Sequence, residues 1–178
     1  MNWALILWIG IPAAIVLILV RFIYRTYNEL TWHLVKVDKI AGNLDAVLKK
    51  KFDMIPALVE VVKGYAKHES SIFTDVARLR SQWGETKNVN SKLKTANLLE
   101  SALSKLLVIQ ERYPQLKANR NFQSIQRSIG AVESQVLNER KYYNEVVRRY
   151  NVRVRLFPRN AIAKMFGFNE REFYSNGE

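Results

Sequence analysis

The feature that most constrains the fold of this chain is an uninterrupted apolar run near the N-terminus. The run extends from Trp3 to Val20, an 18-residue stretch without a charged side chain, and Arg21 and Arg25 follow it. As a helix it would be about 27 Å long, close to the roughly 30 Å thickness of the hydrocarbon core of a bilayer. We therefore predict a transmembrane anchor at residues 1–25 and a separate body at residues 26–178.

A cleaved secretory signal is the competing interpretation of this run. Three features oppose it: Met1-Asn2 carries no lysine or arginine, the run is longer than the usual apolar part of a signal peptide, and no small-residue cleavage site follows. Pro12 lies inside the run, where a membrane span tolerates the bend that proline introduces. Aromatic residues suited to the two membrane interfaces lie near the ends of the run, namely Trp3, Trp8, Tyr24 and Tyr27.

The charged residues beside the run predict its orientation in the membrane. Only the terminal amine precedes the run, whereas four basic residues and two acidic ones follow: Arg21, Arg25, Lys36 and Lys39 against Glu29 and Asp38. Because basic residues stay preferentially on the cytoplasmic side, we expect the N-terminus outside and the body in the cytoplasm. The sequence thus predicts a single-pass protein of the cell membrane.

Apolar residues recur at helical spacing through most of the body. Steps of three and four residues alternate along four series, over residues 27–48, 55–79, 93–106 and 122–154. Such spacing is typical of helices that pack at shallow angles in bundles, and with seven glycines and four prolines the chain has few positions that interrupt them. The predicted fold class is all-α, with a single transmembrane helix, an antiparallel up-down four-helix bundle and a short C-terminal helix.

Polar and proline-containing segments mark the predicted connections. The basic triplet at residues 49–51 ends the first helix, Ser81–Ser91 is a loop, and Tyr113-Pro114 ends the third helix. The predicted N-caps are Asp53 for the second helix, Asn90 or Ser91 for the third, and Asn119 or Asn121 for the fourth. A chain that leaves the membrane and returns twice would have its first and third connections far from the bilayer and the end of its fourth helix near it.

Several separate blocks of the body follow one another in an order typical of a known family. The strongest is Leu44–Glu69, LDAVLKKKFDMIPALVEVVKGYAKHE, and the second is Tyr113–Phe122, YPQLKANRNF. Further positions that fit are Tyr27-Asn28, Glu133, Arg140, Tyr143-Asn144, Tyr150-Asn151, Phe157-Pro158, Ile162-Ala163 and Gly167-Phe168. In these blocks the sequence resembles the LemA family of small membrane-anchored helical proteins. The resemblance implies an antiparallel four-helix bundle on a short anchor, and it implies no established reaction.

Residues that commonly carry metal or catalytic chemistry are few in this sequence. There is no cysteine, and His33 and His68 lack the spacing to glutamate that a metal-binding bundle needs. Charged residues in or beside the apolar series are Glu69, Glu133, Glu139 and Arg140. A catalytic carboxylate with a pKa raised by burial is one interpretation of these residues, and ion pairing between helices is the preferred one. We predict no enzyme, no metal and no cofactor.

The net charge of +12 is concentrated toward the C-terminus. Eight lysines or arginines lie between Arg140 and Lys164, with Glu145 as the only acid among them. A membrane anchor disfavours nucleic acid as a partner, whereas anionic lipid head groups would attract the segment by about 1 kcal/mol per basic residue. The candidate membrane-surface residues are Arg148, Arg149, Arg153, Arg155 and Arg159. A solvated helix face is the alternative, and the tail at residues 161–168 either lies in the interface or closes the end of the bundle.

Two functions from different classes remain open. The preferred hypothesis is a non-enzymatic scaffold or adaptor that presents a surface to an unidentified protein partner in membrane or envelope upkeep. The alternative is a lipid-binding or remodelling protein at the membrane surface. The candidate partner-binding residues lie at the connections expected far from the membrane: Lys50, Asp53, Pro114, Lys117 and Asn119. A structural role as turn and cap residues is the competing interpretation of this set.

Overall fold

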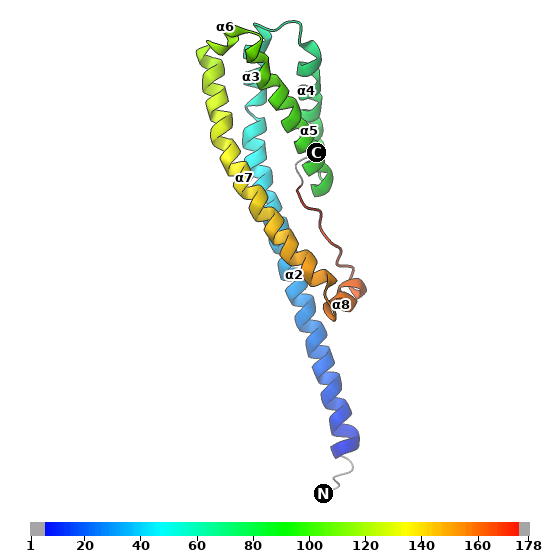
Figure 1. Ribbon diagram of the computed structural model, residues 1–178. Coiled ribbons are helices and arrows are strands. Elements are labelled where there is room, and N and C mark those ends of the chain that lie inside the picture. The colour runs from blue at the N-terminus through cyan, green and yellow to red at the C-terminus, as the bar shows by residue number, and fades with distance from the viewer. Residues whose placement is uncertain (1–5, 175–178) are drawn as a thin grey trace. The chain divides into compact units, whose positions relative to one another are not determined.

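The computed structural model describes residues 6–174, and this part of the chain contains helices and no strand (Figure 1). The elements in chain order are a π-helix η1 (Ile6–Gly10), α2 (Ile11–Phe52), α3 (Ile55–Lys63), α4 (Ser70–Glu85), α5 (Val89–Val108), a 3-10 helix η2 (Ile109–Glu111), α6 (Pro114–Lys117), α7 (Arg120–Arg155) and α8 (Arg159–Met165). The all-helical prediction is confirmed for these residues. The start of the apolar run, including Trp3, lies outside the described residues.

The chain forms two compact units, described here one at a time. The anchor unit contains the described residues up to Lys39 together with Glu145–Arg171, and the core unit contains Ile40–Asn144 with the described residues from Glu172 onward. The helices α2 and α7 contribute residues to both units. The predicted division into an anchor at residues 1–25 and a body at residues 26–178 stays a prediction.

The first part of the anchor unit is an apolar helix whose side chains are exposed all around its axis. Every residue from Trp8 to Phe22 is exposed, and Leu17 retains 69% of its accessible surface. Within the helical stretch Trp8–Lys63, an 18-residue window has a mean hydropathy of 1.8 with only 6% of it buried in the protein. A core helix would bury one side, so this helix is long and apolar enough to cross a membrane and finds no protein partner for its apolar surface among the described residues.

Pro12 lies at a change of helix type near the start of this apolar helix. The π-helix η1 ends at Gly10, and α2 begins at Ile11, which places Pro12 in the first turn of α2. Proline has no backbone N–H, so it cannot donate to a carbonyl of the preceding helical turn. The change from π- to α-helical bonding lies directly before this missing donor.

Within the core unit, the extent predicted for the second helix is wrong. The sequence predicts one helix over residues 55–79, but α3 ends at Lys63 and α4 begins only at Ser70. Gly64 follows α3 directly and has the lowest helix propensity apart from proline. Side chains of the connection also bond elsewhere in the core unit, since Tyr65 Oη accepts a 2.9 Å hydrogen bond from Asn119 Nδ2. These long-range contacts outweigh the helical periodicity of the segment.

One of the predicted helix caps is confirmed, and the other two are wrong. Asn119 caps α7 as expected, accepting a 3.0 Å hydrogen bond from the Phe122 N–H. The α5 helix is capped by Asn88, which accepts from the Ser91 N–H at 3.1 Å, and α4 extends to Glu85, so the predicted loop is shorter than expected. Asp53 is not a cap: its carboxylate accepts from Lys49 Nζ at 2.7 Å, and this bond holds the pKa of Asp53 below its ordinary value.

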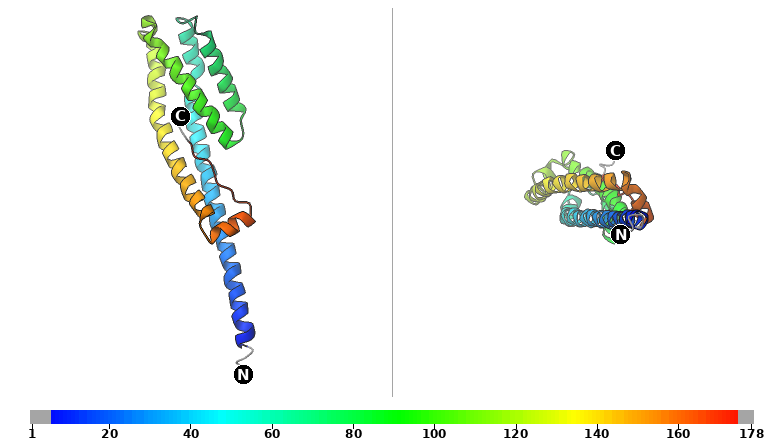
Figure 2. Two further views of the ribbon diagram at one scale, coloured as in Figure 1. Left: turned by 45° about the vertical axis from the view of Figure 1, so that its right-hand side comes forward. Right: turned by 90° about the horizontal axis from the view of Figure 1, so that it is seen from below.

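The apolar core of the core unit is built from the predicted series. Helices α4 and α5 form a hairpin and lie side by side in both figures (Figure 1, Figure 2). The rings of Phe52 and Trp83 meet edge to face at 5.1 Å between centroids, which joins the end of α2 to α4. Residues with almost no exposed surface include Leu44, Leu48, Ile55, Leu58, Leu99, Leu103, Leu106 and Phe122. Their burial supplies the main stabilisation expected of such a core.

This core predicts that the body folds without the anchor. Residues 26–178 should be a soluble, mostly helical protein with a cooperative thermal transition, because the apolar series of the core unit is buried within them. Circular dichroism during heating measures both properties. Weak helical signal with gradual, non-cooperative melting would contradict the described packing.

Candidate functional site

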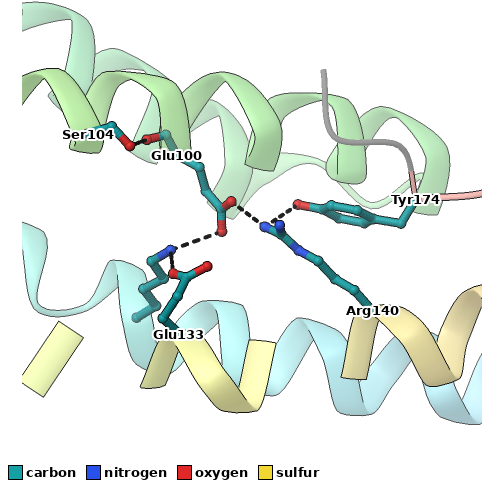
Figure 3. Close-up of polar contacts among 6 residues, drawn as sticks. Glu100, Ser104, Glu133, Arg140 and Tyr174 are labelled. Atoms are coloured by element: carbon teal, nitrogen blue, oxygen red, sulfur yellow. Dashed lines mark hydrogen bonds and ion pairs between the residues drawn. The ribbon is translucent and has the colours of Figure 1, made fainter. Parts of the chain in front are cut away.

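A cluster of charged side chains lies inside the core unit, where three helices and the C-terminal tail meet (Figure 3). We define the C-terminal tail as residues 167–174. Lys51 of α2 contacts Glu100 of α5 with 3.2 Å between Nζ and Oε1, and it also pairs with Glu133 of α7. Arg140 of α7 pairs with the second oxygen of Glu100 and donates to Tyr174 Oη at 3.1 Å. This ion network therefore connects α2, α5, α7 and the tail.

The charges of the ion network balance. Two cations, Lys51 and Arg140, face two carboxylates, and both cations are almost completely buried. Burial lowers the pKa of Arg140, but the hydrogen bond and charge of Glu100 more than offset this, so its pKa is raised and it stays protonated. Burial, and next the charge of Glu100, raise the pKa of Tyr174. The raised pKa values keep the guanidinium of Arg140 charged and the phenol of Tyr174 neutral, which suits a structural role.

Tyr174 completes the network because the tail is held against α7. The Asn144 side chain bonds both polar groups of the Tyr174 backbone, donating to its carbonyl at 2.9 Å and accepting from its N–H at 2.8 Å. Tyr143 Oη donates to the Glu172 carbonyl at 3.1 Å. The guanidinium group of Arg140 also stacks on the ring of Tyr174, with 4.5 Å from Cζ to the ring centroid. The tail has no regular secondary structure, and these backbone groups form their hydrogen bonds with side chains of α7 instead.

The anchor unit repeats the same arrangement one heptad later in α7. Asn151 donates to the Arg171 carbonyl at 2.8 Å and accepts from its N–H at 2.9 Å, while Tyr150 Oη donates to the Asn169 carbonyl at 3.0 Å. Seven helical residues rise about 10.5 Å. Three residues of extended chain cover about 10 Å. Because the two lengths match, Tyr-Asn pairs that are seven residues apart in α7 bind tail residues that are three residues apart.

The tail leaves α8 through a Schellman motif. Gly167 has a φ of +73°, in the left-handed region that glycine occupies without strain. The Phe168 N–H donates to the Ala163 carbonyl at 2.9 Å and the Gly167 N–H to the Lys164 carbonyl at 3.3 Å, the pair of bonds that defines this motif. The reversal turns the chain back along α7.

The predicted partner-binding residues do not form one group. Lys50 and Asp53 lie at the end of α2, and α3 then carries the chain nine residues further before it reverses. Pro114 starts α6, Lys117 lies 3.6 Å from the Glu111 carboxylate, and Asn119 binds Tyr65. Asn119 therefore contacts the connection at residues 64–69, which α3 separates from Asp53 by about 13 Å of helix.

The charged residues that the sequence places in apolar series mostly pair within the protein. Glu69 accepts from Arg112 at 2.8 Å, and Glu133 and Arg140 belong to the ion network. Glu139 differs: its Oε2 atom is buried and has no hydrogen-bond partner among the described residues. His33 lies in the anchor unit, where burial, and next the charge of Arg153, lower its pKa. No group of residues with metal-ligating geometry occurs in the described part of the chain.

The candidate membrane-surface arginines each pair with a carboxylate inside the anchor unit. Their partners are Glu145 for Arg148 and Arg149, Glu29 for Arg153 and Arg159, and Glu170 for Arg155, at distances from 2.5 to 3.1 Å. The hydrogen bonds from Arg148 and Arg149 lower the pKa of Glu145 to about 2, so this carboxylate stays ionised. The arginines therefore have protein partners that compete with lipid phosphates.

Sequence reasoning missed Glu100 and the role of the tail. Glu100 follows an apolar pair in an ordinary amphipathic helix, and nothing local marks it as a partner of Arg140. The tail was detectable in principle, because Tyr143-Asn144 and Tyr150-Asn151 repeat at seven residues and so lie on one helix face. Lys51 was assigned to the end of a helix, whereas its ammonium group reaches inward to two carboxylates.

Comparison with known proteins identifies the family of this chain. The LemA family model matches residues 41–178, and the chain belongs to the LemA family. It is also similar to the magnetosome proteins MamQ 1 and MamQ 2 of Paramagnetospirillum magneticum (strain AMB-1), with 26% identity over 74 residues in each case. The aligned segment covers 42% of this chain and 27% of each magnetosome protein, so the chain matches less than a third of their length.

The ion network predicts a large difference between two superficially similar substitutions. Arg140→Met should destabilise the body by about 3–5 kcal/mol, because it removes one of the two cations of the network and leaves Glu100 and Glu133 with Lys51 alone. Lys94→Met is the control: Lys94 and Glu172 are 3.8 Å apart with side chains 76% and 55% exposed. Breaking that pair should cost less than about 1 kcal/mol.

Urea unfolding of residues 26–178, followed by circular dichroism, measures both free energies of unfolding. Equal, small effects of the two substitutions would show that the network does not hold the helices together.

Proposed function

We propose that this protein is a non-enzymatic scaffold anchored in the cell membrane by one N-terminal span, with its body in the cytoplasm. The observation that carries the proposal is the apolar helix from Trp8 to Phe22, whose side chains are exposed on every side. A bilayer covers such a surface, and water does not. The excess of basic residues after this helix supports the cytoplasmic position of the body.

The use of the polar residues supports a structural rather than a catalytic body. The carboxylates of Glu69, Glu100 and Glu133 each face a cation, and the asparagines of α7 hold the tail. We include in the proposal that the helical segments of the body form an antiparallel four-helix bundle, supported by the hairpin of α4 and α5. The likeness to two magnetosome proteins is compatible with a function at a membrane.

The surface we propose for a protein partner is the end of the core unit at residues 64–69 and 111–119, here called the end surface. Two side-chain contacts join these segments, Asn119 with Tyr65 and Glu69 with Arg112. The exposed lysines Lys67 and Lys117 lie on these same two segments. Exposed basic charges of this kind suit recognition of an acidic partner surface.

The lipid-binding alternative receives less support from the anchor unit. Its electrostatic basis was the row of arginines near the end of α7, and each of these has a carboxylate partner. If these arginines exchanged their carboxylate partners for lipid phosphates, the net gain in binding free energy would be small. We therefore prefer the scaffold over a remodelling function that depends on basic residues.

Site-specific photo-crosslinking in intact membranes tests the proposal. A crosslinker at Lys67 or Lys117 should capture one discrete protein, whereas a crosslinker at Lys94, an exposed lysine on α5, should not. The double substitution Lys67→Glu with Lys117→Glu should abolish the capture and leave the thermal transition of the body almost unchanged, because neither ammonium group is buried. Capture of the same proteins from Lys94 would contradict a specific end surface.

A further inference from the structure

The anchor unit carries a second exposed apolar surface besides the apolar helix. It lies where α7 ends and α8 follows, and it consists of Leu156, Phe157, Met165 and Phe166, which we call the foot. Phe157 retains 85% of its accessible surface and Met165 retains 62%. Single exposed apolar residues are common on proteins, but four on adjoining segments are an unusual surface for contact with water.

Ring contacts place the foot beside the residues that end the apolar helix. The ring of Phe166 packs edge to face on Tyr27 at 4.9 Å between centroids. Phe166 also lines an apolar groove of about 380 Å³ together with Val20, Ile23 and Tyr24. In Figure 1, α8 accordingly lies beside this part of α2. Phe166 of the foot is therefore level with the point where the apolar run gives way to Arg21 and Arg25.

The inner side of α8 is attached to the unit, which leaves the foot facing outward. Ile162 and Ala163 are buried, and Arg159 pairs with Glu29 at 3.1 Å between Nη2 and Oε2. Ile162 packs inward while Met165 is exposed, so α8 has one buried side and one exposed side. The attachment keeps the apolar side chains of the foot in place without a membrane.

We propose that the foot rests in the interfacial layer of the same bilayer that the apolar helix spans. The occupant is lipid, at the boundary between head groups and acyl chains, because the foot is continuous with the helix surface that needs lipid. Tyr24 and Tyr27 next to it are residue types that favour this boundary, and exposed Arg21 and Lys164 suit the head-group side. This inference rests on the proposed membrane anchor.

The contact would orient the body relative to the membrane. One span allows rotation and tilt about its end, whereas a second apolar contact beside it removes much of that freedom. Because apolar side chains make the contact and Arg153, Arg155 and Arg159 are paired with carboxylates, it should persist at high salt and on uncharged lipid. This property separates the foot from an electrostatic lipid-binding surface.

The absence of cysteine from the natural chain makes the test direct. Single-cysteine variants of the full chain are placed in phosphatidylcholine vesicles, labelled with an environment-sensitive fluorophore, and quenched by lipids that carry a nitroxide at shallow or deep positions. Phe157→Cys and Met165→Cys report on the foot, and Leu17→Cys reports on the apolar helix. Val35→Cys is the matched control, an exposed apolar residue of the same unit about 12 Å further along α2 than Tyr27.

At residues 157 and 165 we expect strong quenching by shallow nitroxides and blue-shifted emission. Both signals should be the same in 1 M salt, within the precision of the assay. Residue 17 should be quenched by deep nitroxides, and residue 35 by neither. Quenching at residue 17 with residues 157 and 165 resembling residue 35 would overturn the foot and leave the anchor intact. Absence of quenching at residue 17 would overturn the anchor and the foot with it. Disulfide formation between two copies through residue 157, without quenching, would assign the foot to a dimer contact and overturn the lipid proposal.

Discussion

The pairing of Arg140 with Glu100 is the interaction on which the core unit most depends. It places a guanidinium and a carboxylate in an interior where neither ion can remain without the other. Lys51 shares Glu100 and adds Glu133, so three helices meet at one charge-balanced point. Apolar contacts tolerate sliding between helices, whereas ions at hydrogen-bond distance specify one relative position. The network therefore selects a register that the apolar faces alone would leave open.

The C-terminal tail is part of this arrangement rather than an appendage. Tyr174 contributes its hydroxyl group and ring to Arg140, and the two Tyr-Asn pairs of α7 bind the tail backbone on the way. The spacing works because about 10.5 Å of helix matches three extended residues. In this LemA-family chain, Arg140 thus pairs with α5, and Asn144 and Asn151 bind the tail.

The sequence predicts what depends on composition and local periodicity, and it fails where distant residues decide. The apolar run, the helical content and the cap at Asn119 follow from local rules. The break at Gly64 was missed because the apolar series continues through it, although glycine disfavours a helix interior. Asp53 was assigned to a cap because its position fits one, but Lys49 and Arg80 compete for the carboxylate. Glu100 has no local signature, so its partner became visible only in the folded chain.

Residue-resolved hydrogen exchange of the tail tests the central claim, that helix side chains hold the tail in place, most directly. The Arg171 and Tyr174 N–H groups donate to Asn151 and Asn144, whereas no bond from the Phe173 N–H is recorded among the described residues. We predict slow exchange at Arg171 and Tyr174, fast exchange at Phe173, and loss of the Tyr174 protection in Asn144→Ala. Uniformly fast exchange across these three amides would contradict the account, because it would mean that the tail is not attached to α7.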